Sequence, residues 1–170
     1  ILCAGLGTRL KPMTNNTPKC LIDIKGKPVI RHILNWLNTY PIEFKKCVNL
    51  HYSPLKVMEY LRYEKILYSP EIELMGTAGA IKKMDYWLQP SDFIVVNSDT
   101  ITNVNLMKMI DIHKKGNYLA TIFTHDDAVH NGGVFIFSPL VLRYIPQNTP
   151  YSIHLELIPA LMKVDPNRIH

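Results

Sequence analysis

Two patterns of apolar residues alternate along the chain. Short apolar runs bounded by turn residues predict buried strands at residues 1–4, 45–51, 65–69, 92–97, 118–123 and 133–137. Between them, apolar residues recur at every third or fourth position, which predicts helices at residues 28–40, 54–61, 76–88, 106–115 and 153–162. Ser53 and Pro54 are typical of a helix start, and Gly116 is typical of a helix end.

Strands that alternate with helices predict crossover units. We therefore expect an α/β protein, a Rossmann-like three-layer sandwich with a mainly parallel mixed sheet. The 170 residues, 47% of them apolar, suit a single domain over residues 1–170. Ligands of such sheets bind beyond the carboxyl ends of the strands. Three polar segments fall there, at residues 5–19, 97–100 and 125–133.

Composition narrows the classes of partner. The net charge is +5, and the 19 basic residues are scattered without the clusters that mark nucleic-acid binding, so no nucleic-acid partner is expected. No apolar run reaches the ~18 residues of a membrane span, and the first residues do not form a secretory leader. The three cysteines have no CxxC spacing. We expect reduced thiols in a cytoplasmic protein that does not bind membranes.

The opening stretch, LCAGLGTRLKPMTNNTPKCLI at residues 2–22, matches neither common phosphate loop. A dinucleotide-binding turn would have glycine where Leu10 stands. A Walker A loop would follow a Gly-Lys pair with Ser or Thr, but residues 26–27 are followed by Pro28.

The stretch nevertheless carries groups that bind polyphosphate. Gly5 and Gly7 let backbone N–H groups approach phosphate oxygens and form an anion-binding nest. Arg9 supplies a planar fork and Lys19 a compact charge. The alternative is a glycine turn with solvated cations.

The sequence from residue 4 to 22 resembles the signature GxGTRLxPLT, followed by a PK pair, of the sugar-1-phosphate nucleotidyltransferases, the nucleotide-sugar pyrophosphorylases; Met13 replaces the usual Leu. Four further stretches are similar to family elements in the same order. They are ELMGTAGAI (73–81), FIVVNSDT (93–100), NGGVFIFSP (131–139) and ELIPAL (156–161). Ser98 replaces the glycine of the family's NGD. The resemblance is to the mannose-1-phosphate guanylyltransferase and glucose-1-phosphate thymidylyltransferase types, and it implies the nucleotide-diphospho-sugar transferase fold.

The resemblance implies an enzyme that joins an NTP to a sugar 1-phosphate with Mg²⁺, releasing pyrophosphate, in nucleotide-sugar and polysaccharide biosynthesis. Arg9 would contact the pyrophosphate, Lys19 would lie between the α-phosphate and the sugar phosphate, and Asp99 would hold the metal. Nucleotide-binding residues would be Ala4, Gly5, Leu6, Gly7, Thr8, Gly76, Thr77, Ala78, Gly79 and Asn97. Sugar-binding residues would be Asn131, Gly132 and Glu156.

Each assignment has a plain structural alternative. Asp99 could be a turn or N-cap residue, residues 76–79 a glycine-rich helix start, and Glu156 an exposed helix carboxylate. A further cluster, His125, Asp126, Asp127 and His130, offers zinc ligands in a spacing that no zinc motif uses, so a polar loop is the better interpretation.

Two family features are missing. Only residues 124–132 separate two predicted strands, without the usual EKP-like motif, and no WxDxG segment supplies a second metal ligand; Asp165 lies in another context. We expect that residues of a longer protein are omitted here; the alternative is a shortened relative. Two other functions stay open: a non-catalytic nucleotide-sugar-binding regulatory module, and transfer to a non-sugar phosphorylated acceptor. The base, the sugar and any homo-oligomer are undecided.

Overall fold

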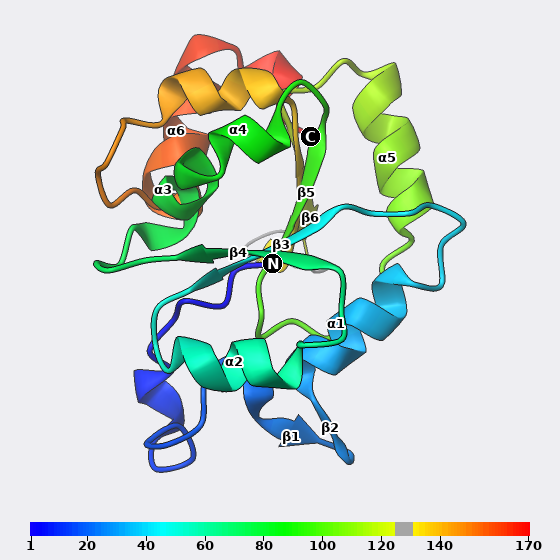
Figure 1. The fold of residues 1–170 in the computed structure, drawn as a ribbon. Coiled ribbons are helices and arrows are strands. Elements are labelled where there is room, and N and C mark those ends of the chain that lie inside the picture. Colours follow the sequence, from blue (N-terminus) through cyan, green and yellow to red (C-terminus); the bar gives the residue numbers. More distant parts are fainter. Residues whose placement is uncertain (125–130) are drawn as a thin grey trace. The chain divides into compact units, whose positions relative to one another are not determined.

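The chain divides into two compact units. The computed structural model describes residues 1–124 and 131–170, with Asn131 described by its backbone only. Unit 1 comprises Ile1–Leu74 and Asn97–Asn103; unit 2 comprises Met75–Val96 and Val104–His170. Figure 1 shows the elements of both. The prediction of a single domain stays a prediction.

In unit 1, strands β3 (Lys46–Leu50) and β4 (Ile66–Pro70) pair in parallel, and helix α2 (Pro54–Tyr60) connects them. This is the crossover that the sequence predicts. Leu2 forms parallel bridges with Asn49 on one side and Asn97 on the other. The opening apolar run therefore lies between two chain segments, but Leu2 forms only isolated bridges, and the strand predicted at residues 1–4 is not formed.

Helix α1 (Val29–Leu37) covers the core of unit 1. It follows the hairpin of β1 (Asp23–Ile24) and β2 (Lys27–Pro28), and two 3-10 turns precede it, η1 (Thr8–Leu10) and η2 (Lys19–Leu21). Its apolar stripe is buried, as the sequence predicts. The core cluster consists of Cys3, Cys20, Ile30, Leu34, Val48, Leu50, Val57 and Leu61. Cys3 and Cys20 flank the glycine loop, so both ends of this loop are anchored in the core.

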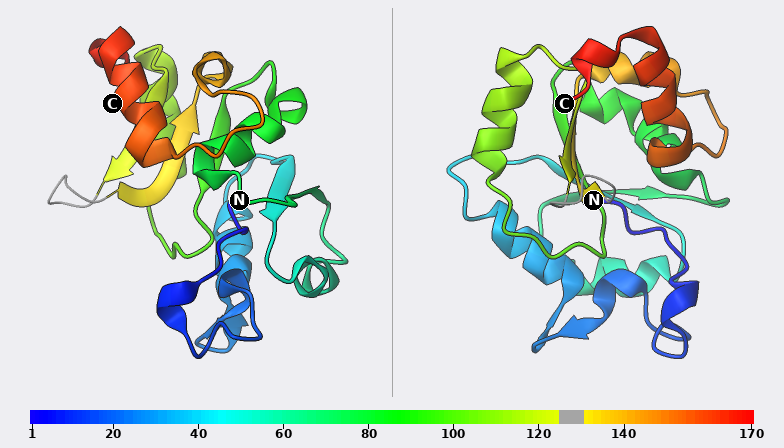
Figure 2. Two further views of the ribbon diagram at one scale, coloured as in Figure 1. Left: turned by 90° about the vertical axis from the view of Figure 1, so that its left-hand side faces the viewer. Right: turned by 180° about the vertical axis from the view of Figure 1, so that it is seen from behind.

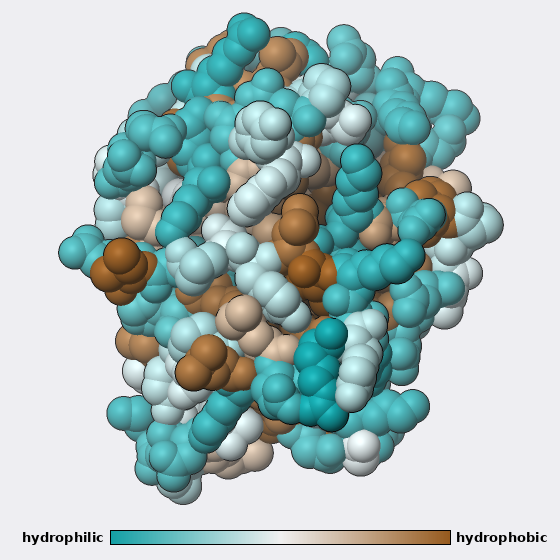
Figure 3. Space-filling model, in the orientation of Figure 1, coloured by the Kyte–Doolittle hydropathy of each residue, from teal (hydrophilic) through white to brown (hydrophobic). Residues whose placement is uncertain are grey.

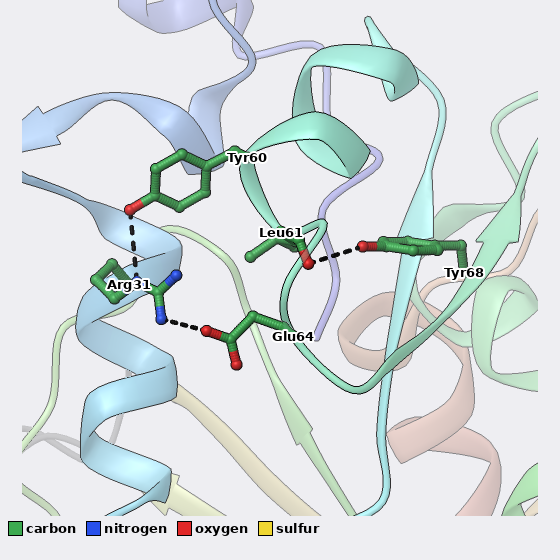
Figure 4. A network of polar contacts seen from close by, with 5 residues as sticks. All are labelled: Arg31, Tyr60, Leu61, Glu64 and Tyr68. Atoms are coloured by element: carbon green, nitrogen blue, oxygen red, sulfur yellow. Dashed lines mark hydrogen bonds and ion pairs between the residues drawn. The ribbon is translucent and has the colours of Figure 1, made fainter.

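A polar network joins α1 to the segment that connects α2 with β4 (Figure 4). Arg31 Nη1 forms an ion pair of 2.5 Å with Glu64 Oε1, and Arg31 Nε donates to the Tyr60 hydroxyl at 3.5 Å. The Tyr68 hydroxyl donates to the Leu61 carbonyl at 3.4 Å. The two bonds of Arg31 hold together elements that are about thirty residues apart in the sequence.

Unit 2 contains an antiparallel sheet in the order β5 (Phe93–Val96), β7 (Asn131–Phe137), β6 (Ala120–Thr124). The mixed character of the expected fold is thus confirmed, since β7 pairs antiparallel with both β5 and β6. The reason is chain length, because only six residues separate Thr124 from Asn131. A parallel connection needs a crossover of a dozen or more residues.

Helices cover both faces of this sheet. Figures 1 and 2 show α5 (Leu106–Lys115) on one face and α3 (Gly76–Lys83) and α6 (Ile158–Val164) on the other. This is the predicted three-layer arrangement. The Asn105 side chain caps α5 by accepting from the Lys108 N–H at 3.0 Å. The predicted helix at 76–88 is divided at Met84 into α3 and α4 (Asp85–Leu88).

The predicted last helix is continuous but irregular. It begins as a π-helical turn, η4 (Ile153–Leu157), and continues as α6. The change from π-helical to α-helical geometry occurs beside Pro159, which has no N–H to donate to the carbonyl four residues earlier. Two further 3-10 segments are η3 (Pro139–Tyr144) and η5 (Pro166–Arg168).

On one face of the molecule, apolar side chains are dispersed among polar ones. On the face drawn in Figure 3, hydrophobic atoms appear in small groups among hydrophilic ones. Among the described residues, no helix has both the length and the apolar character needed to cross a membrane.

Candidate active site

The glycine loop of unit 1 forms a tight turn that presents backbone N–H groups. Gly7 has φ 64° and ψ 26°, a left-handed conformation that favours glycine, and it begins the turn η1. The Leu10 N–H donates to the Gly7 carbonyl at 2.9 Å. The N–H groups of Thr8 and Arg9 have no acceptor within the described residues. Such unpaired groups at the start of a turn can bind an anion.

The predicted loop residues differ in exposure. Ala4 is buried, whereas Gly5, Leu6, Thr8 and Arg9 are exposed. Arg9 forms no ion pair with any described residue. Among the described residues, the Arg9 guanidinium thus has no carboxylate partner that would compete with a ligand.

Lys19 and Asp99 lie in direct contact, although eighty residues separate them in the sequence. Lys19 Nζ forms an ion pair with Asp99 Oδ2, and the two side chains are 22% and 43% exposed. The turn at Asn97–Thr100 brings the carboxylate to the loop. In this turn the Ser98 N–H donates to the Leu2 carbonyl and the Thr100 N–H to the Asn97 carbonyl, both at 3.1 Å. The structure thus brings together two of the residues selected from the sequence.

A buried group of three side chains lies under this turn. The Cys3 thiol forms hydrogen bonds with Cys20 and with Ser98, and all three residues are at least 93% buried. The bond with Cys3, together with burial, raises the pKa of Cys20. Ser98, which stands where the family has glycine, therefore has a packing role of its own.

Sequence reasoning missed a second buried polar pair. Asn49 Oδ1 accepts from the Cys3 N–H at 2.7 Å, and Asn49 Nδ2 donates to Glu71 Oε1 at 2.8 Å. Glu71 is only 6% exposed. Two features of the sequence could have indicated this pair. One is the polar residue inside the apolar run of β3, and the other is the acidic residue directly after β4. This pair holds the start of the loop to the parallel strands.

Residues 76–79 of unit 2 pack closely against another segment of the same unit. A Cβ at Gly76 would lie 2.6 Å from the Tyr151 carbonyl oxygen, and one at Gly79 would lie 2.7 Å from that of Thr149. The Thr77 hydroxyl accepts from the Ile153 N–H at 2.8 Å. Small residues are thus required here for packing. Their nucleotide-binding role stays a prediction.

The three predicted sugar-binding residues also belong to unit 2. Glu156 is exposed, and its Oε2 accepts from the Ser152 N–H at 2.7 Å, which caps η4. Gly132 is buried in β7, where a Cβ would lie 2.1 Å from the Phe123 ring. Both residues therefore have structural roles, and their contacts with sugar stay predictions. The Asn131 side chain and the cluster at residues 125–130 lie outside what the structure describes.

Comparison with known proteins assigns the family. Residues 1–138 match the model of the nucleotidyl transferase family. The chain is 32% identical to a mannose-1-phosphate guanyltransferase of Saccharomyces cerevisiae over 96% of its own length and 55% of the relative. It is 36% identical to the Yarrowia lipolytica protein of the same name over 95% and 54%. The chain belongs to the nucleotidyl transferase family, which confirms the family resemblance, and it spans about half the length of these relatives.

Solved structures confirm the fold. HddC from Yersinia pseudotuberculosis complexed with GMP-PN has a TM-score of 0.77 at 24% identity, covering 93% of this chain and 83% of that one. An apo UDP-glucose pyrophosphorylase has a TM-score of 0.74 at 14% identity, covering 96% and 86%. The α/β architecture of the nucleotide-diphospho-sugar transferases is therefore established for this chain.

Proposed function

We propose that the protein joins a nucleoside triphosphate to a sugar 1-phosphate, giving a nucleotide-sugar and pyrophosphate. The observation that carries this proposal is the contact of Lys19 with Asp99 beside a turn in which the N–H groups of Thr8 and Arg9 have no acceptor among the described residues. Cation, carboxylate and free amides are the groups that phosphoryl chemistry requires. Membership of the nucleotidyl transferase family supports the same reaction class.

The proposed mechanism relies on positioning and on neutralising charge. A sugar phosphate oxygen attacks the α-phosphorus in line as the bond to pyrophosphate breaks. The nucleophile is already an anion, so the protein does not need a general base. Lys19 lies between the two anionic groups and reduces their repulsion. Arg9 and the amides of the turn stabilise the charge that develops on the departing pyrophosphate.

Asp99 is the proposed protein ligand of Mg²⁺. It offers hard oxygen donors and is partly exposed, which suits this cation. No group of three or more acidic, histidine or cysteine side chains that could hold a metal occurs among the described residues. Mg²⁺ commonly binds through one or two carboxylates and the substrate phosphates, so one carboxylate fits. When bound, the ion would supply further neutralisation of phosphate charge.

The relatives suggest which substrates to test first. Two of those compared are named for mannose 1-phosphate and guanylyl transfer, and a Bacillus subtilis relative, 28% identical, is named a probable glucose-1-phosphate cytidylyltransferase. We propose a hexose 1-phosphate as acceptor. A cytoplasmic location, where nucleoside triphosphates occur, is part of the same proposal and agrees with three cysteines that form no disulfide among the described residues.

The test is pyrophosphate release by the full-length protein in the presence of Mg²⁺. Four NTPs and dTTP are each combined with several sugar 1-phosphates. Release with one pair, lost in Lys19→Ala and Asp99→Ala but kept in Glu64→Gln, would support the reaction and identify its substrates. Glu64 is a suitable control because it forms a comparable ion pair elsewhere in unit 1. Tight nucleotide-sugar binding without release from any pair would refute catalysis and favour a regulatory module.

A further inference from the structure

Thr14 is a buried polar residue within the glycine loop, and none of the roles described above involves it. It is 2% exposed, and its Oγ1 donates to the Gly7 carbonyl at 2.7 Å. The same carbonyl accepts from the Leu10 N–H. One hydroxyl therefore ties residue 14 to the turn that presents the amides of Thr8 and Arg9.

Thr14 also packs on the face of Gly7 that Lys19 contacts. A Cβ at Gly7 would lie 2.7 Å from Thr14 Cγ2 and 3.3 Å from Lys19 Cβ. The three residues leave no room for a methyl group. The side chains of Thr14 and Lys19 therefore both lie against the turn at Gly7.

The residues that follow Thr14 are held from another direction. The Tyr52 hydroxyl donates to the Asn15 carbonyl and Lys56 Nζ donates to the Asn16 carbonyl, both at 2.5 Å. Lys56 lies in α2, and Tyr52 lies just before this helix. Thr14 thus links an anchored segment of the loop to the left-handed turn at Gly7.

We propose that Thr14 is a positioning residue for nucleotidyl transfer, which holds the Gly7 turn and the Lys19 stem in the geometry that binds the triphosphate. The inference rests on the proposed function. Donors fixed in advance stabilise developing charge without reorganising during the reaction. Loss of the hydroxyl would loosen the amides of Thr8 and Arg9 without removing any group that touches substrate.

Two substitutions at this position separate the hydroxyl from the shape of the side chain. Thr14→Val keeps the shape and removes the donor, whereas Thr14→Ser keeps the donor. Thr121→Val is the matched control, because Thr121 is also 2% exposed and its hydroxyl lies 2.8 Å from His113 Nδ1 in unit 2. Each variant is assayed for kcat, for KM, for its unfolding midpoint and, by calorimetry, for affinity toward inorganic triphosphate.

We expect Thr14→Val to lower kcat by about 100-fold and to weaken triphosphate binding, while Thr14→Ser stays within about threefold of the unsubstituted protein. KM for the sugar phosphate should change little. Thr121→Val should lower the unfolding midpoint without lowering kcat. This contrast separates a positioning role from a loss of stability.

Wild-type kcat per folded molecule in Thr14→Val, or equal losses in the Ser and Val variants, would overturn the inference. If the unsubstituted protein binds triphosphate but releases no pyrophosphate, the proposed reaction fails, and the comparison of Ser with Val is made on triphosphate affinity instead. If it does not bind triphosphate at all, both proposals are wrong.

Discussion

The ion pair of Lys19 with Asp99 leads to a prediction about nucleotide binding that can be tested without measuring turnover. As long as Asp99 holds Lys19, the ammonium is shared between a carboxylate and any incoming phosphate. Asp99→Asn removes the charge and keeps the size of the side chain. It should therefore release Lys19 and also remove an anion that repels the triphosphate.

The expected changes in stability and in nucleotide affinity depend on how far the Lys19 and Asp99 side chains are exposed to solvent. The side chains are 22% and 43% exposed, so solvent screens the pair. Ion pairs of this kind contribute ~0.2–1 kcal/mol. We therefore expect the free energy of unfolding to fall by no more than about 1 kcal/mol. In metal-free buffer, nucleotide affinity should rise by up to about fivefold, which corresponds to the upper end of that range.

The assay is a calorimetric titration with nucleotide, performed once in EDTA and once with Mg²⁺, beside denaturant unfolding. In EDTA, Asp99→Asn should bind nucleotide more tightly than the unsubstituted protein. With Mg²⁺ the order should reverse, because the variant has lost the proposed metal ligand. At about 1 M salt the gain in EDTA should disappear, since the Debye length is then only ~3 Å.

Glu64→Gln is the control, because it breaks the Arg31–Glu64 pair, whose side chains are 27% and 26% exposed. It should change stability by a similar amount and leave nucleotide affinity unaltered. Weaker nucleotide binding by Asp99→Asn in EDTA would refute the competition for Lys19. A loss of several kcal/mol of stability would show that the pair is structural.

Three further predictions concern stability and thiol chemistry. Gly76→Ala should destabilise the protein by about 2 kcal/mol in denaturant unfolding, since a Cβ would lie 2.6 Å from the Tyr151 carbonyl at a φ of +67°. An added Cβ at Gly5 would meet no described atom within 4 Å beyond its chain neighbours, so an equal loss in Gly5→Ala would contradict this reason. Burial lowers the pKa of His113. The unfolded chain therefore binds more protons, and the free energy of unfolding should fall as pH drops below about 6.5; an undiminished pH slope in His113→Gln would assign it to other groups. Burial raises the pKa of Cys47, the one partly exposed cysteine, so a thiol reagent should label it slowly and before the other two; prompt labelling of all three in folded protein would contradict the burial.

Local pattern determined much of this protein. Apolar spacing predicted the buried stripe of α1 because one face of a helix must meet the core, whatever that core is. The glycines of the loop were identifiable because few other residues adopt a left-handed turn such as that at Gly7. Lys19 and Asp99 were selected by motif and residue type, and their contact agrees with that selection.

Only the tertiary structure decided which distant residues support the loop. The contacts of Asn49 with Glu71 and of Ser98 with Cys3 join segments tens of residues apart, and no local period records such pairs. Thr14 is the last residue of the signature GxGTRLxPLT, but only its burial beside Gly7 shows which carbonyl its hydroxyl contacts. Propensity acts within a few residues along the chain. Packing and buried hydrogen bonds depend instead on what the completed fold brings together.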